Sequence, residues 1–188
     1  DPDLTARLLK LANSAFYAFG TRLSTVTEAV SLIGIQQVQD LILSSSIIDK
    51  FAGMPPESID MASFWRHSLA CGTCARILAT ERRLPNADKF FVAGLLHDVG
   101  RLVLYQQAPA ASKLVFQRYQ ADRMPLQDAE QRMLGFDNSD IARALLQRWN
   151  YPDFLVQAVG AHHRMGHLSH LPVEAAVVHF SDYLVTAM

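Results

Sequence analysis

The chain has 188 residues, 50% of them hydrophobic, and its 17 basic and 18 acidic side chains give a formal net charge of −1. This length suffices for one substantial core or for two lobes that share it. The balanced charge, with no basic stripe, excludes the surface that a nucleic-acid partner would need. No apolar run reaches the roughly 20 residues that span a bilayer, and two cysteines are too few for a disulfide-stapled secreted domain. We therefore expect a cytoplasmic protein that associates with neither nucleic acid nor membrane.

Apolar residues recur at three- and four-residue spacing almost everywhere, and no stretch alternates apolar and polar residues. This pattern predicts an all-α fold. Leucines over residues 4–11 mark the first predicted helix. The second begins at Thr25, where Glu28 completes a capping box, and it ends at Gly34.

The third predicted helix covers residues 35–51, and the clearest break in the chain follows it in the segment GMPPES. This break predicts an N-terminal helical lobe, residues 1–54, and a second helical part, residues 55–188. Because the chain begins and stops inside helical patterns, we expect it to be a piece of a longer polypeptide. Prolines that fit first-turn positions open several later helices. The predicted helices of the second part are 59–83, 88–107, 110–122, 125–134, 139–149, 152–164 and 172 onward.

Four polar residues lie on predicted helices among apolar neighbours: His67, His97, Asp98 and Asp182. Each needs a partner, because burying an unpaired polar group costs at least a few kcal/mol. A divalent cation is one solution, since imidazole nitrogens and carboxylate oxygens together suit Zn, Fe, Mn or Ni. A hydrogen-bonded His–Asp network is the other. The spacing leaves both open, because adjacent helical residues diverge by about 100°.

Five stretches carry a family resemblance: DPDLTARLLKLANSAFY, STVTEAVSLIGIQQVQDLIL, FWRHSLACGTCARILA, FVAGLLHDVGRLVL and LLQRWNYPDFLVQAVGAHH. In this order they resemble the HDOD domain, a divergent branch of the HD superfamily of metal-dependent phosphohydrolases. The resemblance implies an N-terminal helical lobe packed on an HD-like helical core. It also implies an output or regulatory domain of bacterial signalling proteins, which acts on other signalling proteins or on other domains of the same polypeptide.

The resemblance places the one-metal quartet of the superfamily on His67, His97, Asp98 and Asp182. It thus implies a divalent ion (Fe, Mn, Ni, Zn or Mg) and no organic cofactor. Gly94 and Gly100 flank the His-Asp pair and leave room for close helix approach.

The related cyclic-dinucleotide phosphodiesterases add histidines that build a second metal site, and this sequence departs from their pattern. His162 and His163 match the paired histidines, but Asn138 stands where a histidine is expected and Arg164 where a glutamate is expected. The Gly-Tyr-Pro signature is absent. We therefore expect that the chain is not an active phosphodiesterase of that kind.

The complete quartet keeps a second function open, a one-metal phosphohydrolase acting on a nucleotide or another phosphoester. In that case Asp98 would help to orient a water as the catalytic residue, and Arg66 and Arg101 would pair with phosphate. The alternative for both arginines is a solvated surface position. His179, one turn before Asp182, is a candidate partner of the site, or a core histidine bonded to a carbonyl.

Two further motifs fit a structural role better than a chemical one. Cys71 and Cys74 share a helix face with His67, which would allow a zinc site, but we expect small core residues there. His167 and His170 follow Gly166, and we expect them in a loop exposed to solvent. Trp65 and Trp149 lie on apolar stripes and are predicted in the core.

Overall fold

A computed structural model of the chain describes residues 5–6, 9, 12–13, 23–51, 59–164 and 172–188. Within these residues every regular element is a helix, which confirms the predicted all-α class. No helix in this part of the chain combines the length and the apolar character that a membrane crossing requires. The helices are α2 (Val26–Ile33), α3 (Ile35–Lys50), α4 (Met61–Glu81), α5 (Asp88–Leu96), α6 (Val99–Gln107), α7 (Pro109–Asp122), α8 (Leu126–Leu134), α9 (Asn138–Arg148), α10 (Asp153–Ala161) and α11 (Val173–Thr186).

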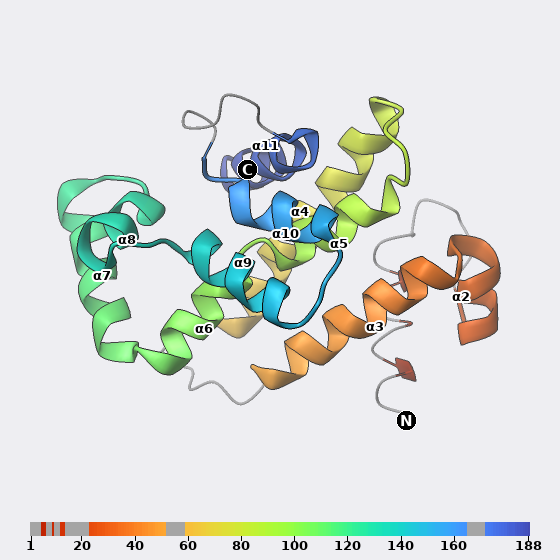
Figure 1. Cartoon of the computed structure of the whole chain (residues 1–188), viewed down its shortest axis with the longest axis horizontal. Coiled ribbons are helices and arrows are strands. Elements are labelled where there is room, and N and C mark those ends of the chain that lie inside the picture. The colour runs from red at the N-terminus through yellow and green to blue at the C-terminus, as the bar shows by residue number, and fades with distance from the viewer. Residues whose placement is uncertain (1–4, 7–8, 10–11, 14–22, 52–58, 165–171) are drawn as a thin grey trace.

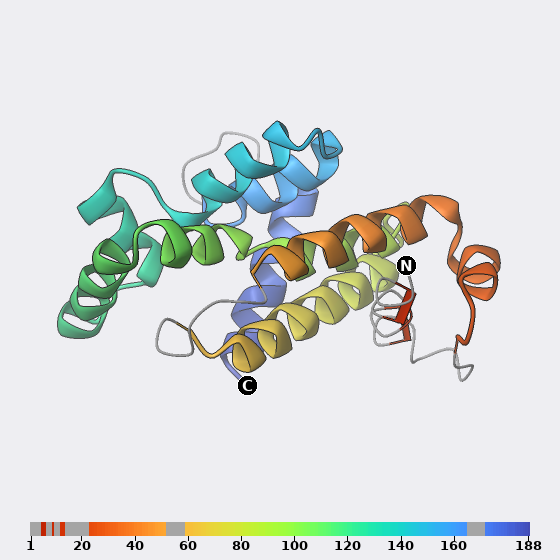
Figure 2. The same cartoon turned by 90° about the horizontal axis from the view of Figure 1, so that it is seen from below.

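Helix α5 lies at the centre of the arrangement. It packs on α3, α4, α10 and α11, while α9 packs on α6 and α10. Helix α2 and the α7–α8 pair lie at opposite ends of the long axis in both views (Figures 1 and 2). The elements that carry the candidate site, α4, α5, α6 and α11, are therefore in the middle of the molecule.

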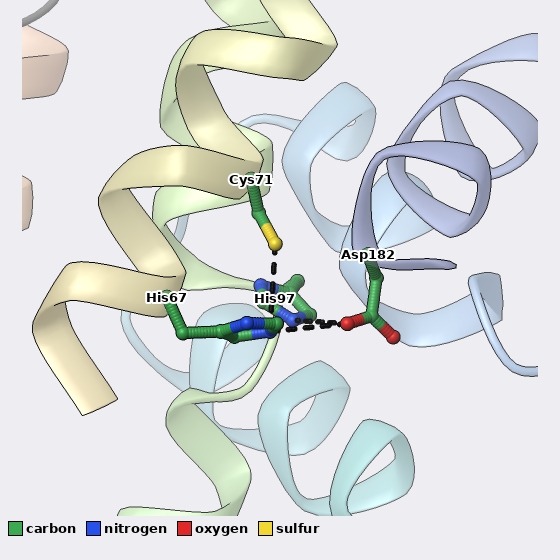
Figure 3. Close-up of side chains that lie close together, drawn as sticks. All are labelled: His67, Cys71, His97 and Asp182. Carbon is green, nitrogen blue, oxygen red and sulfur yellow. Dashed lines mark hydrogen bonds and ion pairs between the residues drawn. The ribbon is translucent and has the colours of Figure 1, made fainter. Parts of the chain in front are cut away.

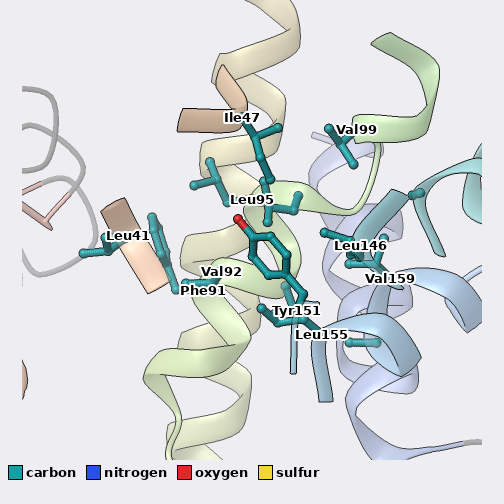
Figure 4. Close-up of a cluster of buried hydrophobic side chains, with 14 of the residues drawn as sticks. Leu41, Ile47, Phe91, Val92, Leu95, Val99, Leu146, Tyr151, Leu155 and Val159 are labelled. Carbon is teal, nitrogen blue, oxygen red and sulfur yellow. The ribbon is translucent and has the colours of Figure 1, made fainter. Parts of the chain in front are cut away.

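The main core joins side chains from most of these helices (Figure 4). Leu41 and Ile47 of α3 belong to the same buried cluster as Phe91 of α5, Leu146 of α9 and Leu155 of α10. Trp65 and Trp149 pack against this cluster, as their stripes predicted. The proposed boundary between residues 54 and 55 falls outside the described residues and stays a prediction, as does the first helix with Leu4, Leu8 and Leu11.

The helix ends follow local chemistry. Thr25 and Glu28 form the predicted capping box of α2, and Gly34 ends that helix with φ of 89°, a conformation that glycine adopts without a steric penalty. Asp137 forms a second capping box with Asp140 at the start of α9. The predicted first-turn prolines are one position off, because Pro125, Pro152 and Pro172 each precede the first helical residue.

The prediction of one helix over residues 88–107 is wrong. The chain forms α5 and α6 with a two-residue break at His97 and Asp98. Asp98 has φ of −101° and ψ of 10°, so the helical direction changes at the candidate ligands themselves. No proline or glycine occupies the break, and for that reason the sequence carried no signal for it.

Glycines let backbones touch at two places beside this break, as the sequence predicted for Gly94 and Gly100. A Cβ on Gly94 would lie 2.7 Å from Cα of Gly72 and 2.8 Å from the carbonyl oxygen of Cys71, both on α4. A Cβ on Gly100 would lie 1.9 Å from the carbonyl oxygen of Asn138. Helix α5 is thereby in backbone contact with α4, and α6 with α9.

Candidate metal centre

Three parts of the fold bring the predicted ligands together. His97 and Asp98 form the break between α5 and α6. His67 extends from α4 and Asp182 from α11, and both lie beside His97 (Figure 3). Nε2 of His67 lies 3.0 Å from Oδ1 of Asp182. Nε2 of His97 lies 3.7 Å from the same oxygen and 3.4 Å from Oδ2 of Asp98. Residues up to 115 positions apart in the chain thus meet in one cluster.

His97 has the bonding of a metal-ligating histidine. Its Nδ1 lies 2.7 Å from the carbonyl oxygen of Gly94, which can only accept, so Nδ1 carries the proton and Nε2 of the neutral ring has a free lone pair. The side chain is fully buried, and within the described part of the chain Nε2 makes no hydrogen bond. An orphaned buried nitrogen that faces two carboxylates is the environment a cation would complete.

The charges around this nitrogen favour a cation as well. Burial lowers the pKa of His97, but Asp98 and Asp182 outweigh it and the net shift is upward. Burial likewise opposes ionisation of Asp182, yet the hydrogen bond with His67 and the contact with His97 hold the pKa of this carboxyl well below its ordinary range. A proton or a metal ion between these groups would satisfy the same negative charge.

Asp98 is held by neighbours on both of its oxygens. Arg101 donates to Oδ2 at 2.6 Å, and Asn138 donates its side-chain amide to Oδ1 at 3.1 Å. Burial would raise the pKa of Asp98, but Arg101 and His97 lower it to about 2. Asp98 is therefore ionised, and its two hydrogen bonds come from Arg101 and Asn138, which lie outside the quartet.

Cys71 is a neighbour for which the sequence allowed a zinc site with His67 but favoured a core position. Its side chain is fully buried, as expected, but its Sγ lies 3.4 Å from Nε2 of His67 (Figure 3). The donor atoms of His67, Cys71, His97 and Asp182 all lie within 4.8 Å of one another. Burial raises the pKa of the Cys71 thiol, and the charge of Asp182 raises it further. The i, i+4 spacing of His67 and Cys71 was the available signal.

A second group of histidines adjoins the cluster. The donor atoms of His97, Asp98 and His162 form one close set, and those of His162, His163 and Asp182 another. Burial lowers the pKa of His163 to about 4, and burial together with His163 lowers the pKa of His162 well below its ordinary value. Both rings are therefore neutral and offer lone pairs.

Three other predicted side chains have partners outside the cluster. His179 bonds through Nδ1 to the carbonyl oxygen of His162 at 2.8 Å, the carbonyl-bonded alternative that the sequence left open. Arg164 pairs with Asp140 of the α9 capping box. Arg66 is exposed and donates to Ser63 at 2.9 Å. His167 and His170 lie outside the described residues.

A cavity of about 710 Å³ opens on the cluster. Arg101 lines it and is only 20% exposed, so the solvated surface position considered for this arginine is not what the structure has. The other lining residues include His67, Asp98, His163, Asp182, and the aromatic side chains Phe64, Tyr105, Phe116, Tyr119 and Tyr183. A small molecule could reach the candidate ligands by this route.

Glu130 is a buried charged residue that sequence reasoning missed. Only 1% of it is exposed, and its Oε2 accepts from the backbone N–H of Asn138 at 2.8 Å. Burial raises the pKa of this carboxyl to about 7, although Arg101 opposes the shift. Its position in a short helix rich in polar residues gave no indication of burial.

The sequence profile of the HDOD domain matches residues 1–165. An uncharacterized protein of Treponema pallidum (strain Nichols) is 30% identical over 172 residues, which are 89% of this chain and 32% of that protein.

Two solved structures share the fold over nearly the whole chain. A candidate phosphohydrolase of Shewanella amazonensis SB2B is 26% identical with a TM-score of 0.82, over 99% of this chain and 65% of that one. A candidate signal transduction protein of Marinobacter aquaeolei VT8 is 27% identical with a TM-score of 0.75, over 100% of this chain and 42% of that one. This chain thus spans about a third to two thirds of the length of these three proteins. The HD-like helical core expected from the resemblance is confirmed. The chain belongs to the HDOD domain family.

Proposed function

We propose that this chain is an output or regulatory domain of bacterial signalling proteins, which acts through protein contacts and holds one divalent metal ion at His67, His97, Asp98 and Asp182. The observation that carries the metal assignment is the buried, unbonded Nε2 of His97 beside two carboxylates. Family membership supports the signalling role, and so does the name of the Marinobacter relative. The matched relatives extend well beyond the shared region, so other domains of the same polypeptide are natural partners.

The donor set fits a divalent ion of the first transition row. Neutral imidazole nitrogens suit Zn, Fe and Ni, and carboxylate oxygens also accept Mn and Mg. Such an ion would join α4, the α5–α6 break and α11, which are held near one another there by side-chain contacts. Its presence would therefore bias the packing of these helices, which is what a regulatory domain needs.

Two-metal phosphodiester hydrolysis is disfavoured at this site. Asn138 supplies a neutral amide where a histidine would be required, and this amide is already bonded to Asp98. Arg164 brings a positive charge to the position of a glutamate and pairs with Asp140. A second cation would have to displace both arrangements.

The metal assignment is tested by elemental analysis of the purified protein. We expect about one divalent ion per chain, and none after His97→Ala. His179→Ala is the matched control. His179 lies outside the three close donor groups, and its Nδ1 is hydrogen-bonded to the carbonyl oxygen of His162. Metal-free wild-type protein that also takes up no added ion would sink the assignment.

A one-metal phosphohydrolase is the second candidate, and the cavity beside the cluster favours it. A bound ion would act as a Lewis acid and lower the pKa of a bound water toward 7. The ionised Asp98 would orient that water, and Arg101 on the cavity wall would meet a phosphate. Turnover of any nucleotide or phosphomonoester in a broad panel, abolished by Asp98→Ala, would favour this function over a purely regulatory one.

A further inference from the structure

The proposed metal site leaves the thiol of Cys71 unused, although its donor atom lies within 4.8 Å of those of His67, His97 and Asp182. Resting on the proposed metal site, we infer that Cys71 takes the place of Asp98 as the fourth protein ligand, which makes the centre a closed, zinc-selective site of two histidines, one cysteine and one aspartate. Its partners are His67, His97 and Asp182.

The spacing of the four donor atoms matches a tetrahedral site. Zinc bonds of about 2.3 Å to sulfur and 2.0 Å to nitrogen at a tetrahedral angle put the two ligand atoms about 3.5 Å apart. Sγ of Cys71 lies 3.4 Å from Nε2 of His67. Oδ1 of Asp182 lies 3.0 Å from Nε2 of His67 and 3.7 Å from Nε2 of His97.

Asp98 is less available than Cys71 for the fourth position. Both of its oxygens are engaged, one with the charged Arg101 and one with Asn138. Its donor atom falls in a separate close group with His97 and His162. Sγ of Cys71 instead has a single polar contact among the described residues, the imidazole nitrogen that would be its co-ligand.

A buried, unpartnered group independently points into this space. His97 is fully buried, its proton is fixed on Nδ1, and its Nε2 makes no hydrogen bond in the described part of the chain. The carbonyl oxygen of Cys71 lies against Gly94, the residue that accepts from His97. The backbone segments that carry the thiol and this imidazole are therefore in direct contact.

A thiolate ligand changes what the centre can do. Sulfur favours Zn, and disfavours Mg and Mn, which prefer oxygen ligands. Four protein ligands also fill a tetrahedral shell, as in structural zinc sites, whereas catalytic sites keep one position open for water. A centre completed by Cys71 is therefore suited to holding helices together and poorly suited to hydrolysis.

Cobalt(II) is the probe that reports the thiolate directly. Loading the purified chain with Co²⁺ should produce a sulfur-to-cobalt charge-transfer band in the near ultraviolet, together with the intense visible bands of tetrahedral cobalt. Zn²⁺ at equimolar concentration should erase both, and excess Mn²⁺ or Mg²⁺ should not. Cys71→Ser should lose the charge-transfer band and bind zinc at least about 10-fold more weakly. Cys74→Ser, the matched control three residues along the same helix, should keep both.

The outcomes separate this inference from the metal assignment itself. Cobalt bound without the band, or a band that survives in Cys71→Ser, overturns the role of Cys71 and leaves a metal site of the proposed quartet standing. No uptake of cobalt, zinc or manganese overturns both. Because the chain has two cysteines, a band that persists in Cys74→Ser assigns the thiolate to Cys71 even where Cys71→Ser folds poorly.

Discussion

Asn138 donates its side-chain amide to Oδ1 of Asp98 at 3.1 Å, across 40 positions of sequence and inside the core. Asn138 stands at the position where the phosphodiesterase pattern has a histidine. The neutral amide of Asn138 thus orients the carboxylate of Asp98 in the candidate centre.

Replacing this amide should be costly. In Asn138→Ala the buried, ionised Asp98 loses a donor, and we expect the free energy of unfolding to fall by about 1 to 3 kcal/mol. Ser139→Ala is the control, since Ser139 is equally buried but makes only a neutral bond of 3.3 Å to Asn138. Urea denaturation measures both variants. Equal losses in the two would contradict a special role for the bond to Asp98.

Gly100 should not tolerate a methyl group. A Cβ there would lie 1.9 Å from a backbone oxygen of Asn138 and 3.0 Å from the backbone nitrogen of Ala142, so Gly100→Ala must push α6 away from α9. We expect a loss at or above the upper end of about 1 to 3 kcal/mol. In Gly135→Ala the Cβ meets no described atom within 4 Å, and only the positive φ of 82° is strained, which costs about 1 to 2 kcal/mol. If the urea midpoint of Gly135→Ala is lower than that of Gly100→Ala, the close packing of α6 on α9 at Gly100 is contradicted.

Removing the metal should lower the melting temperature. An ion present at about 100 times its dissociation constant contributes roughly 2.7 kcal/mol to folding, which for a chain of this size corresponds to roughly 5 to 10 °C. A chelator should therefore shift thermal unfolding of the wild type but not of Asp182→Asn, which keeps the shape of the ligand and loses its charge. Thr186→Val removes only a neighbour that donates to Asp182 at 3.3 Å and should still respond. If the chelator does not change the melting temperature of the wild type, no bound ion stabilises the fold and the prediction is wrong.

Glu130 should make stability fall as pH rises from about 4.5 to about 7. Burial lifts its pKa in the folded protein from the ordinary 4.5 to about 7, so the folded state binds more protons than the unfolded state in this window. Its contribution is fully favourable below the window and is lost as the pH passes through it. Glu130→Gln keeps an acceptor for the Asn138 N–H and removes the titratable group. The free energy of unfolding of the variant relative to that of the wild type should therefore rise by roughly 1 to 3 kcal/mol from pH 4 to pH 8. Denaturation curves for both proteins at the two pH values give the difference, and parallel pH profiles would contradict it.

Much of the secondary structure could be predicted because it depends on local chemistry. The capping box of Thr25 and Glu28 and the glycine that ends α2 are encoded within ten residues. The apolar period located α3, α4 and the later helices to within a few residues. The break at His97 and Asp98 could not be predicted in this way, because no local breaker residue marks it.

The site was predictable only in part for a related reason. Residue types and the family resemblance indicated His67, His97, Asp98 and Asp182, whereas their distances depend on how α4 and α11 cross, which spacing along the chain does not encode. The engagement of Asp98 by Asn138 and the approach of Cys71 to His67 are products of that crossing. The burial of Glu130 likewise follows from the packing around α9.

The contact between Gly72 and Gly94 distinguishes two parts of the candidate centre, the two histidines His67 and His97 on one side and Asp182 on the other. Because α4 and α5 meet backbone to backbone there, the backbone segments that carry His67 and His97 lie close together, and the ring centroids of the two histidines are 5.4 Å apart. Asp182 reaches them from α11, which has no such glycine contact with either helix among the described residues. We therefore expect the two histidines to be positioned before a ligand binds, and the helix that carries Asp182 to be the part that moves.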